Sequence, residues 1–154
     1  MNSGSAILGL VLLAFGAGCS VHPCASGAVP LLEARSASNG GAVEVRIYPG
    51  GCMVRQVRLF GGTGTDFTAS TLLSSAETRA IDDAVEASAF FDLPPSIESR
   101  HVRMSGEYRR LTVRGPRGEH SVTAHFPEYS SQPPEAARFL ALWAHLFELI
   151  ASYR

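Results

Sequence analysis

Polar and apolar residues alternate in three stretches of the first half of the chain. The alternation covers residues 43–48 and 52–60, which are separated by the turn sequence Pro49-Gly50-Gly51, and it returns in residues 67–72. A period of two is typical of a strand with one buried face, and Pro and Gly favour turns. The pattern therefore predicts three consecutive antiparallel strands.

A helical pattern follows the third strand. Ser74 and Glu77 have the spacing of a capping box, in which the two residues bond each other's backbone N–H groups at the start of a helix. Ile81 and Val85 lie on one face of this helix, and Pro94-Pro95 prevents its continuation. We therefore expect one amphipathic helix between these two signals.

The second half of the chain repeats this rhythm. Residues 108–114 and 120–126 alternate around the turn sequence Gly115-Pro116-Arg117-Gly118, and a wide apolar stripe covers one face of residues 135–152. Antiparallel strands followed by amphipathic helices are typical of the α+β class. We expect an antiparallel sheet of about five strands with two helices packed on one face, in the order β-β-β-α-β-β-α.

The N-terminus carries an export signal. Residues 5–18 are almost entirely apolar, and the run is shorter than the roughly 20 residues of a membrane-spanning helix. The sequence Gly16-Ala17-Gly18-Cys19 resembles the lipobox of bacterial lipoproteins. That resemblance implies that Cys19 becomes the new N-terminus and carries acyl chains such as palmitate, which anchor the protein to a membrane. The alternative is ordinary signal cleavage, for instance within residues 24–28.

The segment after the export signal has the composition of a linker. Residues 19–42 are rich in Ser, Gly, Ala and Pro and show no visible period. The chain thus divides into a signal peptide (1–18), a flexible tether (19–42) and a single α+β domain (43–154). Besides Cys19, only Cys24 and Cys52 are present, and in an oxidising compartment they are either a disulfide pair or two unrelated thiols.

Composition and motifs argue against several classes of function. The 154 residues carry a net charge of −1, and all 13 basic residues are arginine, which excludes Schiff-base and P-loop lysines. The near-neutral charge and the lack of interleaved aromatic residues disfavour nucleic-acid binding. His120 and His125 point to opposite faces of a predicted strand and cannot share a metal. We expect no enzyme, metal or cofactor; the alternative is a scattered catalytic site that joins one of these histidines to a carboxylate.

Arginines concentrate between residues 100 and 117, where only one acid, Glu107, occurs. Arg110 and Arg114 share one face of a predicted strand, while Arg109 lies on the other. One interpretation is an ordinary solvated sheet face. The other is a basic surface that binds an anionic lipid headgroup, an acidic polysaccharide or an acidic protein patch. Its candidate residues are Arg109, Arg110, Arg114 and Arg117.

Several segments between residues 43 and 150 match a known pattern. They are the hairpin with Gly50-Gly51, Leu72-Leu73-Ser74-Ser75, the run from Ala87 to Pro94, the strand from Tyr108 to Val113, and Pro134-Glu135 before the last helix. In these segments the chain resembles the emfourins, small α+β inhibitors of thermolysin-like zinc metallopeptidases such as protealysin. It also resembles a bacterial envelope domain of unassigned function that often carries a cysteine in its first hairpin, as Cys52 does here.

These resemblances imply a non-catalytic lipoprotein anchored in the bacterial cell envelope, on the periplasmic side or the outer surface. Its small domain is expected to bind a protein partner, and the emfourin resemblance implies inhibition of a secreted metallopeptidase. The alternative is a structural envelope protein that binds an anionic partner through its arginine-rich sheet face.

Overall fold

The computed structural model describes residue 24 and residues 27–60, 66–99 and 107–153. The predicted signal peptide, Cys19, Arg100 and Arg103 lie outside these ranges. The elements in chain order are β1 (Leu32–Ser38), β2 (Gly41–Ile47), β3 (Cys52–Leu59), β4 (Phe67–Leu72), α1 (Ser75–Ala87), the 3₁₀ turn η1 (Phe90–Asp92), β5 (Ser96–Ile97), β6 (Tyr108–Gly115), β7 (Gly118–Ala124), the 3₁₀ turn η2 (Pro127–Tyr129) and α2 (Pro133–Ala151).

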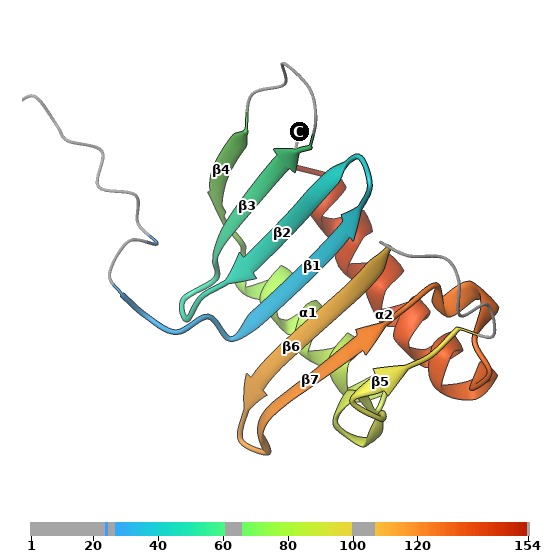
Figure 1. Cartoon of the computed structure of the whole chain (residues 1–154). Coiled ribbons are helices and arrows are strands. Elements are labelled where there is room, and N and C mark those ends of the chain that lie inside the picture. The colour runs from blue at the N-terminus through green and yellow to red at the C-terminus, as the bar shows by residue number, and fades with distance from the viewer. Residues whose placement is uncertain (1–23, 25–26, 61–65, 100–106, 154) are drawn as a thin grey trace, which may run out of the picture.

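The strands form one sheet in the order β4-β3-β2-β1-β6-β7-β5. Neighbouring strands run antiparallel, except that β5 pairs with β7 in parallel. Both helices lie behind the sheet in the view of Figure 1, so one sheet face is covered and the other is open. The predicted α+β class, with one sheet and two helices, is confirmed.

Two details of the predicted sheet are wrong. The sheet has seven strands rather than about five, because β1 and the two-residue β5 were not expected. β1 lies within residues 19–42, so the folded domain begins about ten residues before the predicted boundary at residue 43. The buried positions of β1 include small residues such as Ala34 and Ala37, which made its alternation resemble a Ser/Gly/Ala-rich tether.

The core lies between the covered sheet face and the helices. Leu111 and Val122 of the sheet and Phe139 of α2 are fully buried there, as is Phe90 of η1. Burial of such large side chains contributes roughly 1.5–3 kcal/mol each. In the strands, the alternation that buries Leu111 and Val122 places their neighbours on the open face, which is therefore polar.

Local signals in the sequence correctly predict how α1 begins. Ser74 is the N-cap, and its side chain accepts a hydrogen bond from the backbone N–H of Glu77, at 3.2 Å. The Glu77 carboxylate in turn accepts a hydrogen bond from the backbone N–H of Ser74, at 2.7 Å. In the described ranges, neither helix combines the length and the apolar composition needed to cross a membrane.

Candidate functional site

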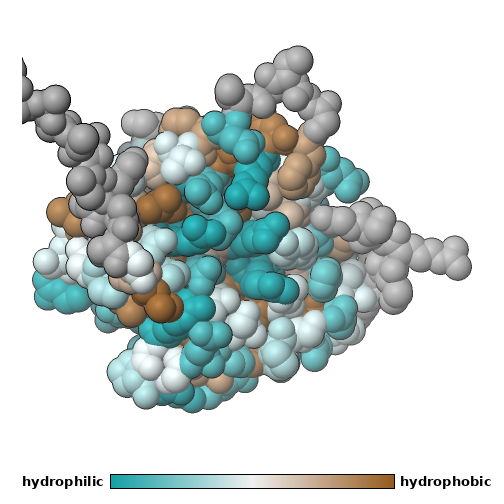
Figure 2. All heavy atoms as spheres, turned by 60° about the vertical axis from the view of Figure 1, so that its left-hand side comes forward, coloured by the Kyte–Doolittle hydropathy of each residue, from teal (hydrophilic) through white to brown (hydrophobic). Residues whose placement is uncertain are grey.

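The open face of the sheet displays polar side chains of several strands. Cross-strand registers place Glu33 and Arg35 of β1 beside Glu44 and Arg46 of β2 on one side. On the other side, Arg35 lies directly opposite Arg110 of β6. The molecular surface is hydrophilic over the middle of this side of the molecule, as Figure 2 shows. The candidate site is therefore a polar sheet surface.

Two arginines of this face are neutralised by carboxylates. Arg114 contacts Glu33 and Glu119, each at 2.6 Å, and it also donates to the backbone oxygen of Pro30 at 2.9 Å. The hydrogen bond to Glu33 raises the pKa of Arg114 above its usual value. Arg46 lies 2.5 Å from Glu44. These groups form a balanced network, so Arg114 offers little free charge to a partner.

The arginine pair at the centre of the face is different. Arg35 and Arg110 are direct cross-strand neighbours, and neither forms an ion pair with any residue that the structure describes. Like charges at directly opposite positions destabilise a sheet. The two guanidinium groups are held by neutral neighbours instead. Arg110 Nε donates to the Thr123 hydroxyl at 3.0 Å, and Arg35 Cζ lies 5.9 Å from the centroid of the Tyr108 ring.

The other two predicted surface residues lie elsewhere. Arg109 is on the covered side of β6, where it contacts Glu128 at 2.6 Å. Arg117 occupies the β6–β7 turn, pairs with Asp92 at 2.6 Å and lies over the Phe91 ring at 5.1 Å. The four arginines that the sequence grouped together therefore do not form one surface. We define the "arginine pair" as Arg35 and Arg110.

Sequence reasoning missed Arg35 because its strand was taken for a tether. The signal that could have found it is the alternation Leu32, Ala34, Ser36 against Glu33 and Arg35. That alternation predicts that Arg35 faces away from the core, on the side where Arg110 was expected. The pairing of β1 with β6 could not be inferred, since it joins residues far apart in the chain.

The two histidines of the predicted strand, His120 and His125, both contact aromatic rings. His120 Nε2 lies 2.9 Å from the backbone oxygen of Leu93, and its ring packs edge-on against Phe90 with centroids 5.4 Å apart. The His125 ring lies 6.2 Å from that of Tyr108. Among the described residues, no group of three or more His, Cys, Asp or Glu side chains is placed to hold a metal ion.

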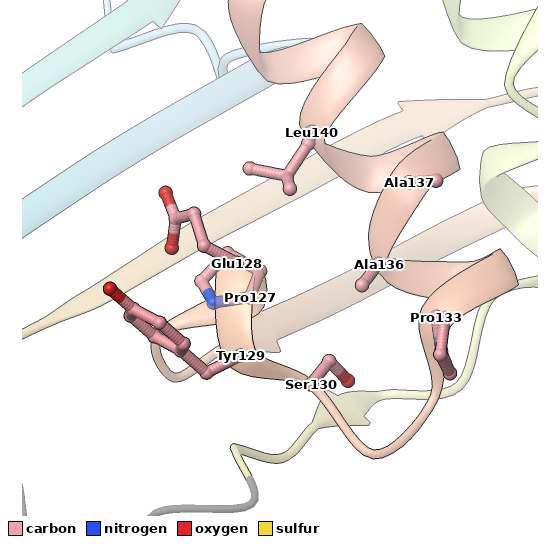
Figure 3. A pocket seen from close by; sticks show the side chains of 8 residues that line it. All are labelled: Pro127, Glu128, Tyr129, Ser130, Pro133, Ala136, Ala137 and Leu140. Atoms are coloured by element: carbon pink, nitrogen blue, oxygen red, sulfur yellow. The ribbon is translucent and has the colours of Figure 1, made fainter.

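A separate hollow of about 450 Å³ lies between η2 and the first turns of α2. Figure 3 shows its lining side chains, which come from these two elements. Most are apolar or small, and its one carboxylate, Glu128, already pairs with Arg109. This hollow therefore has few polar or charged groups that could bind a ligand.

Cys24 and Cys52 are joined by a disulfide, with their Cα atoms 5.6 Å apart. Cys52 opens β3, directly after the turn that contains Gly50 and Gly51. The bond ties the segment before β1 to the end of the sheet where the β2–β3 hairpin turns. Cys24 therefore lies at this end of the domain.

No model of a known protein family matches the chain, and no curated protein matches it. The resemblance to the emfourins rests on the segments quoted from the sequence.

Proposed function

We propose that this protein is an exported, non-catalytic binding domain whose open sheet face holds an acidic surface of a partner protein. The observation that carries the proposal is the arginine pair, two arginines at directly opposite positions of β1 and β6 with no ionic partner among the described residues. Guanidinium groups bind carboxylates through paired, charge-assisted hydrogen bonds. A carboxylate placed between Arg35 and Arg110 would relieve their mutual repulsion, so binding energy and specificity come from the same contact.

The partner that we propose is a thermolysin-like metallopeptidase, with the domain acting as its inhibitor. The support is the emfourin-like order of segments in the sequence, together with a sheet face that neither helix covers (Figure 1). A complex of standard size buries about 800 Å² on each partner. Inhibition here would be steric, since the binding face need only cover the entrance to the peptidase cleft.

The test is an inhibition assay with the oxidised domain, residues 24–154, against a panel of thermolysin-like peptidases. We expect inhibition at micromolar concentration, weakened at least tenfold by the double variant Arg35→Gln/Arg110→Gln. Arg58→Gln is the matched control. Arg58 belongs to β3, lies on the same open face of the sheet and forms no ion pair with a described residue. Full peptidase activity at micromolar concentrations of the domain would reject the inhibitor function. Equal inhibition by both variants would reject the arginine pair as the inhibitory site.

A second function is favoured by the disulfide. If Cys19 is acylated, Cys24 follows the anchor by only five positions, and at about 3.3–3.6 Å per residue Cys24 stays within roughly 17 Å of it. The domain would then act as a structural envelope protein that meets an anionic surface. The intact mass of the mature protein tests the anchor, since acyl chains on Cys19 add mass that secretion without lipidation does not.

A further inference from the structure

A second hollow carries charge of the opposite sign to the arginine pair. It is a groove of about 420 Å³ between α1 and the end of the sheet where β1, β2 and β6 meet their turns. This volume is within the roughly 300–1,000 Å³ typical of ligand sites. Leu32, Ile47, Ile81, Val85 and Val113 form its floor.

The rim of this groove is apolar on the sheet side. Leu31 is 42% exposed there, and Pro116 and Phe91 continue the rim towards the β6–β7 turn. Leu31 is anchored through its backbone, since its N–H donates to the oxygen of Ile47 at 2.7 Å and its oxygen accepts from Arg114 at 2.8 Å. An exposed leucine above an apolar floor offers a contact surface for another apolar side chain.

The helix side of the rim is acidic. Thr78, Asp82 and Glu86 line it at four-residue spacing, which places them along one edge of α1. Neither Asp82 nor Glu86 forms an ion pair with a residue that the structure describes. Arg114, the one cation among the described residues that line the groove, is already neutralised by Glu33 and Glu119. The groove therefore combines an apolar floor with uncompensated negative charge.

We propose that this groove binds an extended peptide segment in which one apolar side chain is flanked by arginine or lysine. The apolar side chain enters between Leu31 and Val85, and the flanking cation meets the carboxylates of Asp82 and Glu86. The groove and the arginine pair require opposite partner charges. The two sites can thus hold two different segments, or two regions of one partner, at the same time.

The test is a selection from a displayed library of random hexapeptides, with the Arg35→Gln/Arg110→Gln variant as bait. This bait removes the arginine pair and with it the proposed site for acidic partners. We expect the selected peptides to carry a Leu, Phe or similar residue next to Arg or Lys. Their affinity should fall at least tenfold for the double variant Asp82→Asn/Glu86→Gln and several-fold for Leu31→Ser.

The matched control is Asp83→Asn, because Asp83 is an exposed acid of the same helix that does not line the groove. Its affinity for the selected peptides should equal that of the bait. The proposal is overturned if no peptide is selected, if the selected peptides are acidic, or if Asp83→Asn weakens binding as much as Asp82→Asn/Glu86→Gln. Peptide binding by a bait without the arginine pair also separates this proposal from the inhibitor function, which can fail independently.

Discussion

Single arginines on the open face differ in what neutralises their charge. Arg114 has two carboxylate partners, whereas Arg110 has the Thr123 hydroxyl and faces Arg35. An arginine with carboxylate partners has its charge neutralised within the fold. Two like charges at directly opposite positions of neighbouring strands lower the stability of the sheet. Such a loss of stability is characteristic of residues that serve binding.

Removing one member of the arginine pair should therefore stabilise the domain. We expect Arg110→Gln to raise the free energy of unfolding by about 0.2–1 kcal/mol, the usual size of a cross-strand pair effect. Urea denaturation at low salt measures the change, and high salt should reduce it because repulsion between exposed charges is screened. A loss of stability larger than that of Arg58→Gln would contradict the unfavourable pairing.

The carboxyl of Glu77 should make stability depend on acid pH. Hydrogen bonds from the Ser74 side chain, from Tyr153 and from the Ser74 backbone lower the pKa of Glu77 below its usual value of 4.5. A lowered folded-state pKa gives stability that is present above 4.5 and is lost as the pH falls through the lower folded value. Urea midpoints measured from neutral to acid pH should fall less steeply for Glu77→Gln than for the unchanged protein; identical slopes would contradict this role.

Elements were predictable where their signals are local. α1 follows from its capping box and from Pro94-Pro95, and the β6–β7 hairpin follows from Gly115-Pro116-Arg117-Gly118. β5 has two residues, too few for any period, and it is held by its parallel pairing with β7. β1 has small residues at buried positions, so its place in the sheet depends on neighbours that only the folded chain supplies.

The position of β1 makes the domain boundary testable. β1 lies between β2 and β6 and pairs with both, so its removal would split the sheet into two parts. We expect a chain of residues 43–154 to remain unfolded and a chain of residues 24–154 to fold. Circular dichroism and amide NMR dispersion distinguish the two states. A cooperative unfolding transition of residues 43–154 would restore the boundary inferred from the sequence.

The disulfide should contribute substantially to stability. Cys24 and Cys52 are 28 positions apart, and closing a loop of this size stabilises a fold by about 3–4 kcal/mol in the chain-entropy model. We expect Cys24→Ser/Cys52→Ser to lower the free energy of unfolding by an amount in this range. Reduction of the unchanged protein should have the same effect. Unfolding curves that are equal with and without reductant would contradict the contribution.

At the scale of the whole molecule, the covered face forms the core and the open face carries the proposed function. The sequence predicts that Arg110 and Arg114 face one way and Arg109 the other, and the structure places them so. It does not predict that Arg35 lies opposite Arg110, because strand order is set by packing across the sheet. The candidate site was thus half predictable: the strand β6 was found, and its partner strand was not.

The arginine pair is the proposed binding surface for acidic partners. Amide NMR titration of the oxidised domain with poly-glutamate, at low and high salt, tests this most directly. We expect chemical-shift changes centred on Arg35, Arg110 and their neighbours in β1 and β6, reduced by high salt and abolished by Arg35→Gln/Arg110→Gln. Changes located elsewhere, or unaffected by salt and by this double variant, would contradict the account.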